Sequence, residues 1–358
     1  MLRGAHALAA VAFLSVLTST GVTATAQRTF VASYGLTTNT AFNCSITKPC
    51  RGFSEAVGVT NSGGEVVVLD SAGYGPVTIT QSVSIIAPAG VYAGISVFAA
   101  LDGVTVAAGA TDKVVLRGLT INGQGGNNGI RVLNVGELHI DDCIMANLGM
   151  DGILVEGGST VHVVRAVVRS NAGHGLHVIS GVPAVQVSDS YLVGNGVHGV
   201  FIEAGEFNGS RLTVENNVGD GVLAQTPPSI TINITLTDSV LTNNDVGFNA
   251  MAPSGADTVN AALNRVTARR NTTYGIRFVG NSGFVNAVVA DSHVVETGHI
   301  GIYAVNGATV SLNGTTSAGN KDLDLYASVA IIRTTGTNSF TGRVSGDIFG
   351  TLTTNPQQ

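Results

Sequence analysis

The chain has 358 residues, of which 44% are hydrophobic and only 11% are charged, and its formal net charge is −6. This apolar content excludes a disordered chain, and the lack of any basic cluster argues against binding to a nucleic-acid backbone. The 47 glycines, the absence of Trp and the many Val, Thr, Ile and Asn residues favour short strands separated by turns over helices.

Residues 1–26 have the pattern of a secretory signal peptide. Arg3 precedes an apolar run from Ala7 to Leu17, and Ala24-Thr25-Ala26 supplies the small residues preferred before a cleavage site. A membrane anchor is the alternative, but it would need roughly 20 apolar residues. We therefore expect the mature chain to begin near Gln27, with a secreted or periplasmic location and no membrane span after cleavage.

Residues 27–63 are predicted to form an N-terminal loop and a short helix. Cys44 and Cys50 lie close together in a polar loop, and export would permit a disulfide between them. A metal site at these cysteines would lack further Cys or His partners. We predict a Cys44–Cys50 disulfide, and a buried structural role for the remaining cysteine, Cys143.

A pattern that recurs about every two dozen residues occupies residues 64–338, and such a period is typical of a solenoid. Charged residues of alternating sign mark its repeats. They are Arg117, Asp142, Arg165, Asp189, Arg211, Asp238, Arg265 and Asp291. Alternating apolar residues before each charge indicate a strand, a change of inward parity after it indicates a bend and a second strand, and a third strand follows a glycine.

Three short strands per repeat, each pairing with its equivalent one coil away, describe an all-β, right-handed parallel β-helix. Equivalent residues would then stack about 4.8 Å apart. The alternating charges would attract one another along their row. A second row is predicted to form an inward ladder of side-chain amides, made of Asn171, Asn195, Asn217, Asn244 and Asn271.

The ends of the solenoid differ. Phe53, Ala56 and Val57 lie on one face of the predicted short helix, which is well placed to cap the first coil. Residues 339–358 are polar and rich in Gly and Thr, and we predict a C-terminal tail there with no comparable cap.

The asparagine ladder and three-strand coil resemble pectate-lyase-like proteins from about Gly64 to Leu325. More narrowly, Pro49-Cys50-Arg51, the following helix and Gly63-Gly64-Glu65-Val66-Val67-Val68-Leu69 resemble the N-terminal segment of exported bacterial β-helix proteins. Both resemblances imply the right-handed β-helix fold.

Candidate catalytic residues lie just before the repeat glycines. This row is Asn128, Asp151, His174, His198, Asp220, Val246, Tyr274 and Ile300. Gly173-His174-Gly175-Leu176 resembles the Gly-His-Gly motif of polygalacturonases, and Asp151 stands where one Asp of their Asp-Asp pair would stand. Met150 replaces the other Asp, so the acid and base of an inverting hydrolase are not both present.

The row leaves two functions open. Asp151, His174, His198 and Asp220 are the catalytic candidates if the protein is a polysaccharide lyase or a polygalacturonase-like hydrolase acting on an acidic polysaccharide. The favoured alternative is a non-catalytic protein that presents a long strand face for glycan binding or adhesion, because the catalytic set is incomplete and fold alone does not fix function.

The outward residues two positions after the glycines include aromatic and basic side chains, which suit the apolar faces and polar groups of a glycan. The binding candidates are Arg131, His177, Phe201, Arg277 and Tyr303. An ordinary exposed sheet face is the competing interpretation.

A further polar stack contains His139, His162 and Gln186. Two histidines without a third ligand do not make a zinc site, so we predict neither a metal nor a cofactor.

Overall fold

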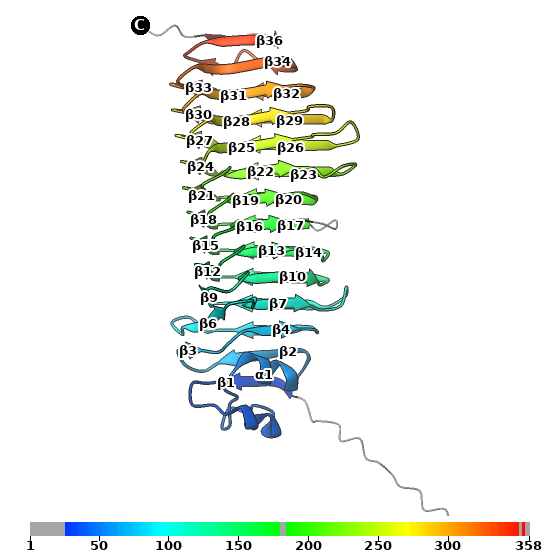
Figure 1. Ribbon diagram of the computed structural model, residues 1–358, viewed down its shortest axis with the longest axis vertical. Coiled ribbons are helices and arrows are strands. Elements are labelled where there is room, and N and C mark those ends of the chain that lie inside the picture. Colours follow the sequence, from blue (N-terminus) through cyan, green and yellow to red (C-terminus); the bar gives the residue numbers. More distant parts are fainter. Residues whose placement is uncertain (1–25, 180–183, 351–352, 355–358) are drawn as a thin grey trace, which may run out of the picture.

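The computed structural model describes residues 26–179, 184–350 and 353–354, which form a tall stack of parallel β coils (Figure 1). The predicted signal peptide lies outside the described residues except for its last position. Among the described helices, none is both long and apolar enough to span a bilayer. The fold is a right-handed parallel β-helix, as predicted.

From β2 onward each coil contributes a strand to each of three columns, in which neighbouring strands pair in parallel. The first column contains β1 (Ala26–Val31), β2 (Thr60–Val68), β5 (Val83–Ile86), β8 (Lys113–Arg117), β11 (Glu137–Asp141), β14 (Thr160–Val164), β17 (Ala184–Ser188), β20 (Gly205–Ser210), β23 (Thr231–Thr237), β26 (Thr258–Asn264), β29 (Phe284–Ala290) and β32 (Ala308–Asn313).

The second column follows the bend. It contains β3 (Ala72–Gly73), β6 (Ala93–Phe98), β9 (Leu119–Gln124), β12 (Ile144–Ala146), β15 (Val167–Arg169), β18 (Tyr191–Val193), β21 (Thr213–Glu215), β24 (Val240–Thr242), β27 (Thr267–Arg269), β30 (His293–Val295), β33 (Thr316–Ala318), β35 (Ser339–Phe340) and β37 (Thr353–Thr354).

The third column follows the repeat glycine. It contains β4 (Val77–Ile79), β7 (Val104–Ala107), β10 (Ile130–Asn134), β13 (Ile153–Val155), β16 (Leu176–Val178), β19 (Val200–Ile202), β22 (Val222–Gln225), β25 (Val246–Met251), β28 (Tyr274–Val279), β31 (Ile300–Val305), β34 (Leu323–Thr334) and β36 (Val344–Gly350). The last two strands are long enough to pair in the first column as well.

Inward side chains of all three columns fill the centre of the coil. Val161, Val168 and Leu176 represent the three columns in one repeat, and each is almost completely buried. Their alternation with outward residues is the period-two pattern expected of strands that bury one face. Cys143 is also buried, and burial raises the pKa of its thiol to about 12, so its structural role is confirmed.

The alternating charge row forms bidentate ion pairs, in which an arginine binds the aspartate one coil earlier. These are Arg165 with Asp142, Arg211 with Asp189, and Arg265 with Asp238, all with N···O distances of 2.5–2.9 Å. The six residues have φ angles of 51–55°, in the left-handed region, which produces the bend.

The predicted register of the alternating charge row was wrong at its first member, Arg117. Arg117 aligns with Asp141, to which its Nη2 atom donates at 2.9 Å. Gly118, with φ of 73°, occupies the bend position instead. Glycine adopts this conformation at no steric cost. Gly118 therefore takes the bend position that a charged residue holds in later coils, and Arg117 lies one residue before the bend.

The asparagine ladder is confirmed. Asn171, Asn195 and Asn217 each donate an amide N–H to the Oδ1 atom of the next member, at 2.9–3.0 Å. The same Oδ1 atoms accept the backbone N–H of the preceding member at 3.0–3.3 Å. The ladder therefore satisfies backbone groups at a buried bend where no strand pairing is available.

The N-terminal end carries the predicted disulfide between Cys44 and Cys50, whose Cα atoms are 4.9 Å apart. The 3-10 helix η1 (Thr37–Phe42) and α1 (Phe53–Val59) lie at this end of the stack (Figure 1). The strand pairing extends beyond residues 64–338, the extent predicted for the β-helix. On the N-terminal side β1 pairs with β2, and on the C-terminal side β35 pairs with β37.

Candidate functional site

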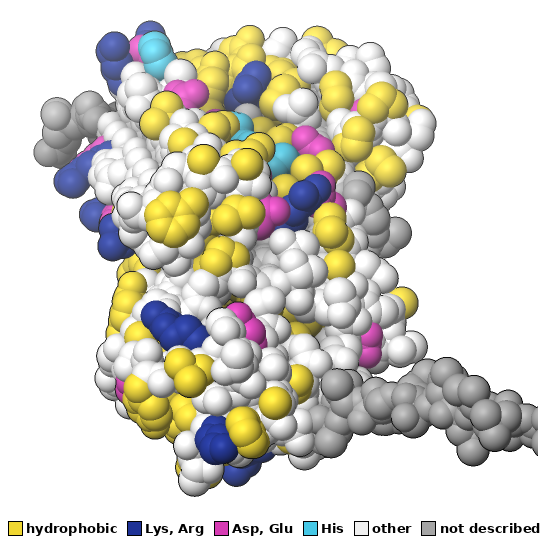
Figure 2. Space-filling model, turned by 60° about the horizontal axis from the view of Figure 1, so that its bottom comes forward, with side chains coloured by type: hydrophobic (Ala, Val, Ile, Leu, Met, Phe, Trp, Pro, Cys, Tyr) yellow, Lys and Arg dark blue, Asp and Glu magenta, His cyan; other side chains and the backbone are white. Residues whose placement is uncertain are grey.

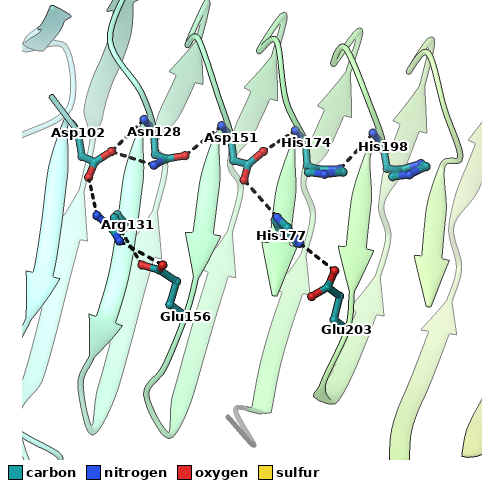
Figure 3. A network of polar contacts seen from close by, with 9 residues as sticks. All are labelled: Asp102, Asn128, Arg131, Asp151, Glu156, His174, His177, His198 and Glu203. Atoms are coloured by element: carbon teal, nitrogen blue, oxygen red, sulfur yellow. Dashed lines mark hydrogen bonds and ion pairs between the residues drawn. The ribbon is translucent and has the colours of Figure 1, made fainter. Parts of the chain in front are cut away.

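The residues just before the repeat glycines form a continuous ladder across the third column (Figure 3). In this ladder a side chain accepts the backbone N–H of the next member. Asp102 accepts from Asn128 at 3.1 Å, Asn128 from Asp151 at 3.1 Å, Asp151 from His174 at 2.7 Å, His174 from His198 at 3.3 Å, and His198 from Asp220 at 2.8 Å.

The glycines that follow this ladder are required by close packing between coils. A Cβ atom on Gly175 would lie 2.5 Å from the carbonyl oxygen of Gly199, and one on Gly199 would lie 2.7 Å from the carbonyl oxygen of Gly221. Real Cβ atoms do not approach backbone oxygens so closely. Because these positions carry no Cβ atom, adjacent coils pack closely enough for the preceding polar residues to form hydrogen bonds from one coil to the next.

The ladder fixes the protonation state of two histidines. A backbone N–H can only donate, so the Nδ1 atoms of His174 and His198 must be unprotonated acceptors, and each Nε2 carries the proton. Burial lowers the pKa of both imidazoles to about 4. At neutral pH both rings are neutral donors through Nε2 rather than general bases.

Asp220 is a buried carboxyl at the C-terminal end of this catalytic set. Burial raises the pKa of its carboxyl to about 6, although Asn249 donates to its Oδ2 atom at 2.8 Å. Asp151 lies three coils away, which is about 14 Å at about 4.8 Å per coil. Glycoside hydrolases place their two carboxyls about 5–9.5 Å apart, so this pair does not have catalytic spacing.

The outward residues of the third column stack in the predicted register, as successive strand pairings establish. His177 lies between two acids: its Nδ1 is 3.3 Å from Asp151 Oδ2 and its Nε2 is 3.7 Å from Glu203 Oε1. Its ring also stacks on Phe201 with a centroid distance of 4.8 Å. The imidazole thus separates the carboxyls of Asp151 and Glu203.

Arg131 occupies the equivalent place near the N-terminal end of the column. Its guanidinium makes two hydrogen bonds to Glu156, at 2.6 and 3.1 Å, and lies 3.7 Å from Asp102 (Figure 3). Asp102, Glu156 and Glu203 also belong to this site, although the sequence did not predict them. Asp102 precedes Gly103 just as Asp151 precedes Gly152, and that signal could have found it.

Aromatic side chains extend the outward column toward the C-terminal end. Tyr274 and Tyr303 have ring centroids 4.8 Å apart, and Tyr303 stacks on Tyr326 at 5.4 Å. The Arg277 guanidinium lies 5.6 Å from the Tyr274 centroid. We call the residues Arg131, Leu154, His177, Phe201, Leu223, Asn249, Arg277, Tyr303 and Tyr326 the outward column.

The predicted catalytic residues are brought into one neighbourhood only in part. Asp151, His174 and His177 meet beside a hollow of about 390 Å³, which Met150, Leu154 and other apolar side chains also line. His198 lies one coil further and stacks on His174 at 5.2 Å. Figure 2 shows histidine and acidic side chains among hydrophobic ones on one face of the molecule.

Comparison with known proteins agrees with this architecture. Residues 96–232 match the family described as right handed beta helix region. The crystal structure of pectate lyase Pel9A matches 93% of this chain and 80% of its own, with a TM-score of 0.51 and 14% sequence identity. No curated protein sequence matches the chain. The structural likeness therefore concerns the fold.

Proposed function

We propose that the protein is a non-catalytic β-helix that binds a glycan along the outward column, after export through the predicted signal peptide. The fold supports a carbohydrate-related role, since a pectate lyase has a similar fold. Fold alone is weak evidence, so the proposal depends on the chemistry of the column itself.

One observation carries the proposal. Six buried side-chain polar atoms of the described residues have no hydrogen-bond partner, and three of them belong to the outward column: His177 Nε2, Asn249 Oδ1 and Arg277 Nε. Buried polar groups are ordinarily satisfied. Arg277 Nε is a donor and Asn249 Oδ1 is an acceptor, and His177 Nε2 is an acceptor in the neutral ring, whose Nδ1 donates to Asp151. All three atoms are covered by neighbouring groups, so a sugar hydroxyl or carboxylate reaches them only when these side chains move.

The aromatic members add the second requirement of a glycan site. Phe201, Tyr303 and Tyr326 are half-buried, and their rings stack on neighbours along the column. Apolar sugar faces pack against such rings while polar groups fix orientation. The protonated Nε2 atoms of His174 and His198 add two donors beside the column.

The tautomers argue against the enzymatic alternative. His174 and His198 hold backbone amides through Nδ1, so neither offers a free lone pair for proton abstraction. Asp151 accepts the His174 amide and contacts His177, and its distance from Asp220 does not suit a two-carboxyl mechanism.

The test is a turnover screen of acidic and neutral polysaccharides with the purified protein. New reducing ends report hydrolysis, and absorbance from unsaturated uronate reports lyase activity. We expect neither product to exceed that of heat-denatured protein. Robust turnover that disappears in Asp151→Asn would contradict the proposal and establish the enzymatic alternative.

A further inference from the structure

A cluster of possible metal ligands lies on strands β11 and β14 of the first column, whereas the outward column lies on strands of the third column. His139 and His162 are partners in the parallel pairing of these strands, and Glu137 precedes His139 by two residues on the same outward face. All three side chains are half-buried and accessible. The sequence alone predicts no zinc site here, because the stack of the two histidines offers no third ligand.

The structure supplies that third group. Glu137 Oε1 lies 2.5 Å from His139 Nε2, and the His139 and His162 rings stack with centroids 4.7 Å apart. One ligand atom from each of the three residues lies within 4.8 Å of both others. Ligands of a tetrahedral zinc ion lie about 3.3 Å from one another, given bond lengths of about 2.0–2.1 Å.

We propose that Glu137, His139 and His162 bind one divalent transition-metal ion of the Zn²⁺ type, with solvent completing the coordination. Two imidazoles and one carboxylate suit Zn²⁺ better than Ca²⁺ or Mg²⁺, which prefer oxygen ligands. The three side chains are only half-buried, so rotation about their side-chain bonds can bring the ligand atoms to the spacing that one ion requires. The ion would take the place of the hydrogen bond between His139 Nε2 and Glu137 Oε1, with the proton of the neutral imidazole held at Nδ1.

Lys113 is the competitor for this site. Its Nζ atom lies 3.0 Å from Glu137 Oε1, where an ion would also bind. The Glu137 carboxylate thus already contacts one cationic group in this structure. Lys113 is exposed and flexible, so it can move away when an ion binds.

A second group of suitable side chains, Asp151, His174 and His177, is less suited to a metal. Metal-bound imidazoles usually donate their second N–H to an acceptor. His174 does the opposite, because its Nδ1 accepts the His198 amide and its Nε2 carries the proton. We therefore expect the ion to bind at Glu137, His139 and His162 only. Because the two clusters share no residue, mutation of one histidine from each cluster tells them apart.

The test is calorimetric titration of chelator-treated protein with Zn²⁺, followed by titration with Co²⁺ to record its visible spectrum. We expect one equivalent to bind and the Co²⁺ complex to show the strong absorption of four-coordinate metal. Losing an outer-shell partner of a ligand typically costs about 10- to 100-fold in metal affinity. Removing a ligand in His162→Ala should therefore weaken binding by at least about 100-fold.

Two control variants make the assignment specific. His299→Ala removes an exposed imidazole that pairs with Asp322, and His177→Ala removes the second cluster's histidine. Both should bind Zn²⁺ as the parent does. The proposal is overturned if the parent binds no more Zn²⁺ than His162→Ala, or if His177→Ala removes binding while His162→Ala does not. Far-UV circular dichroism checks that each variant keeps its β structure.

Discussion

The Nδ1 atom of His198 accepts the backbone N–H of Asp220 at 2.8 Å. This bond makes His198 a rung between two coils and fixes its neutral tautomer. His174 does the same for His198 at 3.3 Å. A row that resembles a catalytic motif in sequence is therefore a structural ladder that also presents N–H donors to the surface.

Two replacements of His198 should show whether its hydrogen bond to the Asp220 amide stabilises the fold. His198→Asn keeps an acceptor for the Asp220 amide, whereas His198→Leu leaves that amide unsatisfied. An unsatisfied buried donor costs about 1–3 kcal/mol, so we expect urea unfolding to show that loss in His198→Leu and a clearly smaller one in His198→Asn. Equal losses in both variants would show that the hydrogen bond does not hold the coils.

Acid should destabilise the protein through the two ladder histidines. Their folded-state pKa is about 4, below the ordinary value near 6.5. Between about pH 6.5 and 4 the unfolded chain binds more protons, so stability falls as the pH falls through this window. Asp220, with its pKa raised to about 6, acts in the opposite sense and destabilises the fold as the pH rises through 6.

Asp220→Asn therefore should stabilise the protein at about pH 7.5, by on the order of 2 kcal/mol, and steepen the acid loss. Chemical unfolding across the pH range measures both effects. Asp322→Asn is the control, because it removes an exposed carboxyl whose pKa is lowered by His299 and should give no gain at neutral pH. A parent and variant with parallel pH profiles would exclude a raised Asp220 pKa.

The buried asparagine ladder has an exposed counterpart that serves as its control. Asn217 bonds to Asn195 and Asn244 in the interior, while Asn260 bonds to Asn233 and Asn286 at the surface. Asn217→Ala should cost about 1–3 kcal/mol because buried partners lose their bonds. Asn260→Ala should cost less than about 0.5 kcal/mol, since water replaces the lost partner. Equal unfolding midpoints for the two variants would count against this ladder.

The ion row should show electrostatic coupling between neighbouring coils. Arg211 binds Asp189 on one side and also interacts with the charge of Asp238 on the other. Arg211→Asp should lower the melting temperature at low salt, added salt should relieve much of the loss, and Asp189→Arg should partly rescue it. Simple additivity in the double-mutant cycle at every salt concentration would mean that the two residues are not stacked.

Most of the coil could be predicted from the sequence because its rows repeat a physical requirement. Gly175 and Gly199 leave no room for Cβ atoms, and this fixed the register of the outward column. Arg117 was misplaced because Gly118 can adopt the bend conformation without any side-chain signal. Strand β1 was missed because its parallel partner follows only after the disulfide loop and α1.

The candidate site was predicted less completely. Sequence spacing placed Asp151 and His174 in one row, but it could not show that a backbone amide occupies His174 Nδ1. Glu203 and Glu156 reach their partners diagonally, across coils, and such contacts depend on side-chain direction rather than on the repeat alone. The third metal-ligand candidate, Glu137, was missed for a similar reason, since it lies two residues before His139 rather than in its stack.

The most direct test of glycan binding without turnover is affinity electrophoresis of the parent, Tyr303→Ala and Tyr191→Ala in gels that contain polysaccharides. Tyr303 belongs to the outward column, whereas Tyr191 is an exposed tyrosine on β18 of the second column. We predict that at least one polysaccharide retards the parent and Tyr191→Ala, that Tyr303→Ala migrates faster in that gel, and that the polysaccharide remains uncleaved. Equal retardation of all three proteins, or cleavage of the polysaccharide by the parent, would contradict the account.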